Sequence, residues 1–128
     1  MKKILIIEDS LDVASNIEYM LSKAGYQVFV ANDGAGGVAM AKEKVPDLIL
    51  MDLMLPDIQG GEAVKTIKTF PSCKEVPVIF LTGLMSGGQE KNDGVETINV
   101  DGKAYPAFGK PFDFSQLLKI IEKQLNGR

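Results

Sequence analysis

Five polar residues in this sequence end or directly follow short apolar segments, in an arrangement suited to binding a metal ion and a phosphoryl group. They are Glu8, Asp9, Asp52, Thr82 and Lys110. Short apolar runs bounded by turn residues are typical of buried parallel strands. Because the carboxyl ends of parallel strands share one edge of a sheet, where open α/β sheets bind ligands, we expect these five side chains to lie together.

The three carboxylates of this set, on Glu8, Asp9 and Asp52, would repel one another in one crevice. A hard divalent cation relieves that repulsion, and Mg²⁺ favours a few protein carboxylates together with waters and a phosphate oxygen. We therefore expect a Mg²⁺ site. The simpler alternative is a solvated acidic loop edge that binds no metal, and the spacing of the residues leaves both open.

Asp52 is also suited to act as a nucleophile, since carboxylates accept phosphoryl groups when a metal screens the incoming charge. Lys110 would then neutralise a phosphoryl oxygen as a point charge, and the Thr82 hydroxyl would donate to another. Each has a simpler interpretation. Lys110 could form a salt bridge with Asp52 or Asp9, and Thr82 could bond to nearby backbone at its strand end.

Strands and helices alternate along the chain, which predicts how these residues are positioned. The predicted strands are 3–7, 27–31, 47–52, 76–81 and 105–109. The predicted helices are one that begins at a cap at Asp9 or Ser10 and stops at Gly25, then 35–44, 61–70 and a last one capped by Asp113 or Ser115. This alternation predicts an α/β fold, a flavodoxin-like doubly wound five-stranded parallel sheet in the order 2-1-3-4-5.

Residues 84–103 are the exception to this regular pattern. They contain four glycines and have poor helical periodicity. We expect an irregular Gly-rich segment here in place of a regular fourth helix, with at most a short helix near 86–92.

The composition is that of one domain covering residues 1–128, with enough apolar residues, 45%, for one core. A net charge of -3 argues against direct binding of nucleic acid. With one cysteine and no histidine, the chain has no internal disulfide, no cysteine metal cluster and no histidine acid–base chemistry. No segment is long enough to span a membrane, so we expect a cytoplasmic protein without membrane contacts.

Taken together, these residues resemble the receiver domain of bacterial two-component response regulators, the CheY-like family, over essentially the whole chain. The segments that carry the resemblance are ILIIEDS, DLILMDLMLPDIQGGE, PVIFLTG and FGKPFD. The resemblance implies that Asp52 is the phosphoacceptor, supplied by a sensor histidine kinase or a phosphotransfer protein. It also implies that Asp9, Asp52 and the backbone carbonyl of Met54 bind Mg²⁺, with Glu8 acting through water.

The same resemblance implies that Thr82 and Lys110 contact the phosphoryl group and that the Lys110–Pro111 peptide bond is cis. One position departs from the family. Three residues before the lysine the family usually has an aromatic residue that moves inward with the threonine on activation, and this chain has Ala107 there.

These expectations describe a phosphorylatable switch that assists its own phosphorylation and dephosphorylation rather than an enzyme. It would act on an unidentified downstream protein as a monomer or a phosphorylation-dependent dimer. One alternative is a receiver-like interaction module that works without phosphorylation. Another is an aspartate-nucleophile phosphatase, which typically has a second acid where this chain has Met54. A flavodoxin-like cofactor binder would need a phosphate-binding loop where this chain has the acidic segment EDSLD.

Overall fold

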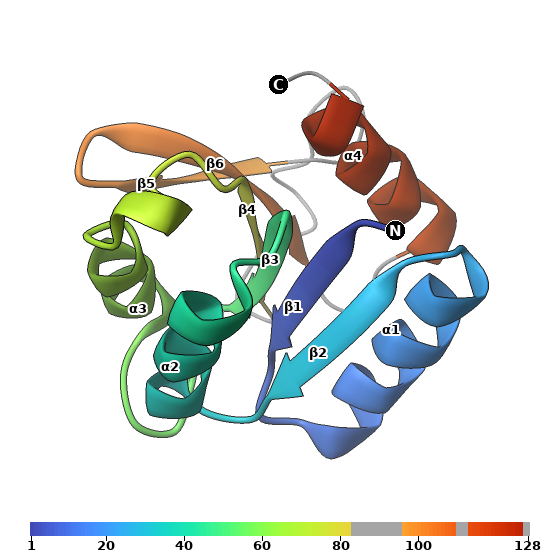
Figure 1. Ribbon diagram of the computed structural model, residues 1–128, viewed down its shortest axis with the longest axis horizontal. Helices are drawn as coiled ribbons and strands as arrows, with labels where there is room; N and C mark the ends of the chain where they lie inside the picture. Colours follow the sequence, from blue (N-terminus) through green and yellow to red (C-terminus); the bar gives the residue numbers. More distant parts are fainter. Residues whose placement is uncertain (83–95, 110–112, 127–128) are drawn as a thin grey trace.

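The computed structural model describes residues 1–82, 96–109 and 113–126, which form a central sheet between two layers of helices (Figure 1). The strands are β1 (Lys3–Ile7), β2 (Gln27–Ala31), β3 (Leu48–Asp52), β4 (Val78–Thr82), β5 (Glu96–Val100) and β6 (Lys103–Gly109). The helices are α1 (Leu11–Lys23), α2 (Gly34–Lys44), α3 (Gly60–Ile67), the short 3₁₀ helix η1 (Pro71–Cys73) and α4 (Phe114–Asn126). No helix in these ranges is long and apolar enough to cross a membrane.

The strand order is β2-β1-β3-β4-β6-β5, and all neighbours are parallel except β5, which runs antiparallel to β6. The predicted α/β doubly wound fold is confirmed, and β6 lies beside β4, where the fifth strand was expected. The predicted number of strands is wrong, because β5 adds a sixth at the edge of the sheet.

The sixth strand arises from a hairpin within the segment expected to be irregular. Val100 pairs with Lys103, and the two residues between them, Asp101 and Gly102, have φ angles of 53° and 83°. Positive φ at both central residues is the geometry of a type I′ turn, for which Asp-Gly is a favoured sequence. The Gly102 N–H also donates to Asn99 Oδ1 at 3.0 Å. Residues 96–100 are therefore regular, while 84–95 and the short helix expected near 86–92 lie outside the described residues.

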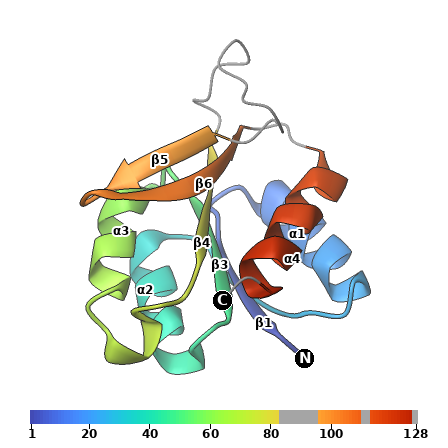
Figure 2. The same ribbon diagram turned by 90° about the horizontal axis from the view of Figure 1, so that it is seen from above.

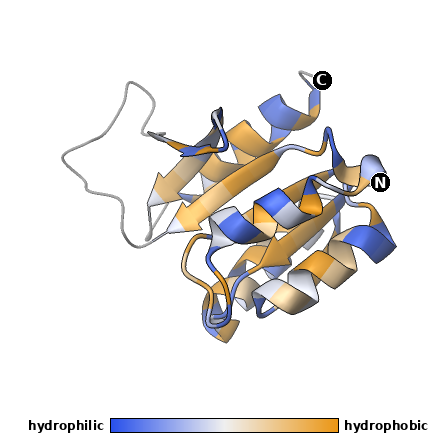
Figure 3. Cartoon of the chain, turned by 90° about the vertical axis from the view of Figure 1, so that its left-hand side faces the viewer, coloured by the Kyte–Doolittle hydropathy of each residue, from blue (hydrophilic) through white to orange (hydrophobic). Residues whose placement is uncertain are grey.

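Two hydrophobic clusters, one on each face of the sheet, make up the core. Alternate side chains of the central strands point to opposite faces, as Leu5 and Ile7 do to one and Ile4 and Ile6 to the other. Helices α2 and α3 cover the first face and α1 and α4 the second (Figure 2). The central strands β1, β3 and β4 are accordingly apolar along their length, whereas α1 and α4 carry one apolar and one polar side (Figure 3).

Prolines account for two boundaries that differ from the predicted ones. Helix α3 stops at Ile67 rather than continuing to residue 70. Helical geometry is disfavoured for a residue that precedes a proline, and Phe70, which precedes Pro71, is extended. Strand β4 begins at Val78 rather than at residue 76, because Pro77 has no N–H to donate to the sheet. At the first helix, Ser10 is the cap, and its hydroxyl accepts from the Val13 N–H.

Candidate functional site

The carboxyl ends of β1 and β3 bring three carboxylates together. Glu8, Asp9 and Asp52 each offer an oxygen, and these oxygens all lie within 4.8 Å of one another. Glu8 is fully buried, Asp52 is 4% exposed and Asp9 is exposed. The structure thus gathers the three acids at one edge of the sheet, as predicted, with two of them shielded and one open to solvent.

The strand register and nearby backbone amides fix this arrangement. Ile7 pairs with Met51, so Glu8, which directly follows β1, lies next to Asp52, the last residue of β3. The Met54 N–H donates to Asp52 Oδ1 at 3.1 Å, and the Ser10 N–H donates to Glu8 Oε2 at 3.0 Å. These bonds orient both carboxylates and offset part of the cost of removing them from water.

Thr82 is fully buried at the end of β4, the strand next to β3. Because Asp52 pairs with Leu81, Thr82 lies at the same edge of the sheet as the acids. It pairs with Gly109 of β6, the residue before Lys110. Lys110 and the Lys110–Pro111 bond lie outside the described residues, so their predicted roles stay predictions.

Met54 lies two residues after Asp52, in the loop between β3 and α3. The residue is 55% exposed, and its backbone forms an isolated antiparallel β-bridge with Gln59. The role predicted for its carbonyl, as a metal ligand, stays a prediction. Its amide has a role that the sequence did not reveal, since it donates to Asp52.

Asp57 anchors the same loop to the start of α2. Its carboxylate accepts from the Gly34 N–H at 2.7 Å and from the Ala35 N–H at 2.9 Å. These backbone hydrogen bonds, first that from Gly34, hold the pKa of Asp57 below its usual value. Asp57 adds a second negative charge to the positive end of α2, where the N-cap Asp33 already accepts from the Gly36 N–H at 2.7 Å.

Gly60 sets how closely α3 approaches the end of β3. A Cβ at this position would lie 2.4 Å from the Asp52 carbonyl oxygen and 3.0 Å from Leu53 Cα. Both neighbours are backbone, so neither has a flexible side chain that can move aside. Gly60 therefore allows the helix to begin directly against the strand that carries Asp52.

Ala107, where the family usually has an aromatic residue, is buried on the α3 side of β6. Tyr105 faces the same side, two residues earlier, and packs edge-on against Phe80 at 5.9 Å between ring centroids. Phe108 faces the opposite cluster. Neither of these aromatic residues occupies the position of Ala107. The structure therefore also lacks an aromatic side chain at the position where the family usually has one.

A doubly wound sheet with an acidic cluster at its carboxyl edge is the arrangement expected of a receiver domain, and comparison with known families agrees. Residues 4–122 match the family model of the response regulator receiver domain. The chain belongs to this family.

Similar proteins include PilH of Pseudomonas aeruginosa, which is 35% identical over 99% of this chain and 100% of its own length. The transcriptional regulators RpaA of Synechocystis and HprR of Escherichia coli are each 36% identical, over 98% and 96% of this chain. Of those two proteins the chain spans about half, 49% and 51%.

Solved structures with the same fold include the chemotaxis protein CheY4 of Vibrio cholerae. Its TM-score is 0.82 at 29% identity, covering 98% of this chain and 99% of that one. The receiver domain of the sensor histidine kinase PA1611 from Pseudomonas aeruginosa has a TM-score of 0.80 at 30% identity, covering 97% of each chain. That structure has a magnesium ion coordinated in its active site cleft.

The acidic cluster of this chain fits such an ion. It supplies oxygen ligands only, which hard divalent cations prefer. Its three carboxylates are close enough to share one ion, and Asp9 opens the cluster to solvent, so that waters can complete the coordination.

Proposed function

We propose that this protein is a phosphorylation switch in which Asp52 accepts a phosphoryl group and Glu8 and Asp9 help to hold Mg²⁺ beside it. The observation that carries the proposal is the approach of three carboxylates to within 4.8 Å at the edge of a receiver-family sheet. Such a cluster is costly without a cation, and it suits one that also binds a phosphate oxygen.

In the transfer step, an Asp52 oxygen forms a bond to the phosphorus of a donor while the bond from phosphorus to the leaving group breaks. With a phosphohistidine donor, the products are an acyl phosphate on Asp52 and a free imidazole, which takes up a proton. Water later attacks the phosphorus, releasing inorganic phosphate and restoring the carboxylate. Bound Mg²⁺ would neutralise part of the negative charge of the phosphoryl group.

The chain's own residues position the nucleophile for this step. The Met54 amide holds Asp52 Oδ1, and Gly60 lets α3 close against the carbonyl of Asp52. Thr82, at the end of the neighbouring strand, is the residue we assign to donate its hydroxyl to a phosphoryl oxygen, and the pairing of Asp52 with Leu81 supports this assignment. Lys110 is the residue we assign to neutralise another oxygen, by the family motif FGKPFD.

The donor we propose is a sensor histidine kinase or a phosphotransfer protein, and the output is a changed surface recognised by a downstream protein. Phosphorylation would shift an equilibrium between two surface states. The chain is not proposed to turn over an external substrate. A phosphatase would need a second acid two residues after Asp52, where Met54 has a thioether.

The test is incubation with Mg²⁺ and acetyl phosphate, a small phosphodonor, followed by intact mass measurement. We expect one phosphoryl adduct, which is lost in Asp52→Asn and on omission of Mg²⁺. Asp12→Asn is the matched control, because Asp12 is an exposed aspartate on α1, outside the acidic cluster. An adduct that survives in Asp52→Asn would contradict the assignment of the acceptor.

A second assay separates a switch from a phosphatase. Steady turnover of p-nitrophenyl phosphate that requires Asp52 would support the phosphatase. We expect no turnover above that of the Asp52→Asn variant.

If no adduct forms although the protein is folded, NMR with the phosphoryl mimic beryllofluoride distinguishes two explanations. Shifts near Asp52 and Thr82 would indicate fast dephosphorylation, and their absence would favour the module that works without phosphate.

A further inference from the structure

A pocket of about 290 Å³ lies between α3 and the β5–β6 hairpin, away from the acidic cluster. Its lining residues are Val64, Lys65, Lys68, Lys74, Val100, Asp101, Lys103 and Tyr105. Strand β6 starts here at Lys103, and its other end, Gly109, pairs with Thr82. The pocket is therefore at the opposite end of this strand from the candidate phosphorylation site.

The charge of the lining is opposite to that of the whole protein. Four lysines and one aspartate surround the pocket, in a chain whose net charge is -3. One of these lysines is neutralised, because Lys65 Nζ lies 3.4 Å from Glu62 and 3.7 Å from Asp101. Among the described residues, neither Lys74 nor Lys103 has a carboxylate oxygen within 4.0 Å of its ammonium group. The pocket thus keeps an excess of positive charge.

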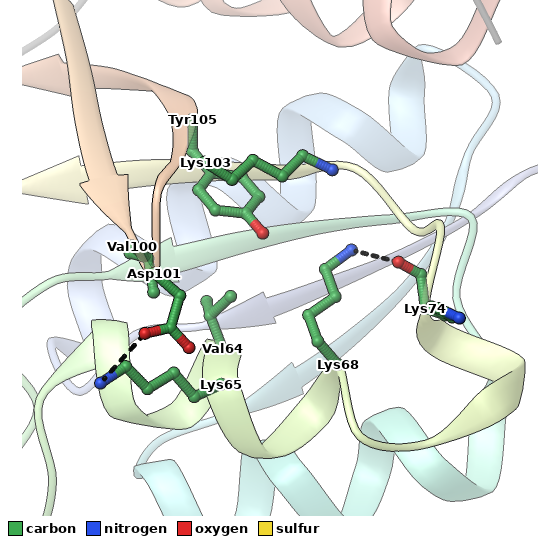
Figure 4. A pocket seen from close by; sticks show the side chains of 8 residues that line it. All are labelled: Val64, Lys65, Lys68, Lys74, Val100, Asp101, Lys103 and Tyr105. Carbon is green, nitrogen blue, oxygen red and sulfur yellow. Dashed lines mark hydrogen bonds and ion pairs between the residues drawn. The ribbon is translucent and has the colours of Figure 1, made fainter.

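The polar groups of the lining converge on one side of the pocket. Figure 4 shows the Tyr105 hydroxyl and the Lys68 side chain directed into the space between the hairpin and α3. The Lys68 ammonium donates to the carbonyls of Val76 and Lys74, which fixes its position. Lys103 Nζ lies 5.4 Å from the centre of the Tyr105 ring, so a second ammonium is held nearby.

Tyr105 adds a neutral donor to these cations. Tyr105 is 6% exposed, and within the described residues its hydroxyl has no hydrogen-bond partner. Burial, with the nearby charge of Asp101, raises the pKa of Tyr105, which favours the protonated form of the hydroxyl further. Val64 and Val100 supply an apolar wall beside it.

We propose that this pocket is a binding site for a small organic phosphate. The phosphoryl group would lie against Lys68, Lys103 and the Tyr105 hydroxyl. The apolar part of the ligand would lie against Val64 and Val100. Lysine ammonium groups bind phosphate as point charges, and a concave pocket of this volume suits a small molecule better than a protein surface. This proposal does not depend on the role of Asp52.

The test is an NMR titration of the full chain with phenyl phosphate, which combines a phosphate monoester with a compact apolar group. Mg²⁺ is left out, so that the acidic cluster repels the anion. We expect shifts of the Val64, Val100 and Lys103 amides and a Kd of about 1 mM or tighter. Inorganic phosphate should bind more weakly, because it lacks the apolar group.

Two variants locate the binding groups. Tyr105→Phe keeps the ring that packs on Phe80 and removes only the hydroxyl, and Lys103→Gln removes one charge. Each is expected to raise the Kd about tenfold, since each removes a hydrogen bond to a charged group. Lys123→Gln, an exposed lysine on α4 across the sheet, is the matched control and should leave the Kd unchanged.

Three results would overturn the proposal. One is the absence of shifts up to about 10 mM phenyl phosphate. Another is a Kd that is the same in Tyr105→Phe, Lys103→Gln and the unaltered chain. The third is binding of a tetraglutamate peptide without binding of phenyl phosphate, which would indicate an acidic protein segment instead. Asp52→Asn should bind phenyl phosphate normally, so failure here and failure of the phosphoacceptor assignment are distinguishable.

Discussion

Asp57 is a single residue that joins two loops beside the acidic cluster. Its carboxylate binds the first two amides of α2, while Asp33 binds the Gly36 amide. These contacts place two negative charges at the positive end of one helix. Because Asp57 lies in the loop that follows Asp52, this anchor also limits how far that loop can move.

We expect Asp57→Asn to lower stability at neutral pH and to lose this effect in acid. Because the pKa of Asp57 is lowered in the folded state, its contribution is present above the ordinary aspartate pKa of about 3.9. It is lost as the pH falls through the folded-state pKa. The measurement is the urea midpoint of both proteins from neutral pH down to about pH 3. A difference that is constant over this range would contradict the assignment.

Gly60 and Gly61 form a matched pair at the start of α3. Gly60→Ala is expected to destabilise the protein by about 1–3 kcal/mol, since its Cβ would overlap the Asp52 carbonyl. Gly61→Ala should be neutral or stabilising by up to about 1 kcal/mol, because its Cβ would lie 3.7 Å from Val100 and alanine favours helix.

Chemical denaturation measures both substitutions, and the acetyl phosphate assay adds a second readout. Displacement of α3 from β3 in Gly60→Ala should also slow phosphorylation of Asp52, whereas Gly61→Ala should not. Equal stabilities for the two variants would show that α3 does not need to approach β3 so closely.

At the scale of elements, the β5–β6 hairpin is the feature that distinguishes this chain from the expected five-stranded sheet. It extends the sheet past β6, and Ile98 and Val100 pack into the cluster that contains α3. The hairpin therefore covers part of the sheet face on which α3 packs, and its residues form one wall of the pocket between α3 and the hairpin.

The stability of this hairpin should depend on Gly102 in its turn. Gly102→Ala is expected to cost about 1–2 kcal/mol, because φ is 83° at this residue and a Cβ is strained there. Asp101→Asn is the control, since asparagine tolerates the left-handed conformation that Asp101 adopts, and loss of an exposed ion pair matters little. The measurements are urea unfolding and hydrogen exchange of the Ile98 amide. Ile98 pairs with Tyr105 across the hairpin. Unchanged exchange in Gly102→Ala would count against a hairpin dependent on this turn.

At the scale of the whole molecule, the acidic cluster should couple Mg²⁺ binding to global stability. A ligand that binds only the folded state stabilises it by about 2.7 kcal/mol at one hundred times its Kd. We therefore expect Mg²⁺ to raise the midpoint of thermal unfolding and a chelator to reverse the change. Asp52→Asn should be more stable than the unaltered chain without Mg²⁺, since it relieves repulsion, and should lose most of the response to Mg²⁺.

The exposed Glu62 on α3 provides the control for this experiment. Glu62→Gln removes a carboxylate outside the cluster, so it should keep the full response to Mg²⁺. If both variants respond like the unaltered chain, the stabilisation by Mg²⁺ does not arise at Asp52.

The sequence by itself determined the doubly wound fold and the edge of the sheet that carries the site. Apolar runs such as 4–7 and 48–51 are unbroken because both faces of a central parallel strand are buried, and this pattern is local and readable. The order of strands then places Glu8, Asp9 and Asp52 together without knowledge of any side-chain conformation. The β5–β6 turn is equally local, because Asp-Gly is by itself a sequence typical of a two-residue hairpin turn.

Only the tertiary structure decided the contacts that join distant parts of the chain. The bonds from Asp57 to α2 depend on how two loops approach each other, and the fit of Gly60 depends on the distance between a helix and a strand. The pocket between α3 and the hairpin combines residues of α3, of the segment between α3 and β4, and of the hairpin, which are separated in sequence. Local periodicity encodes which face of an element is buried, whereas distances between elements are set by packing of the complete core.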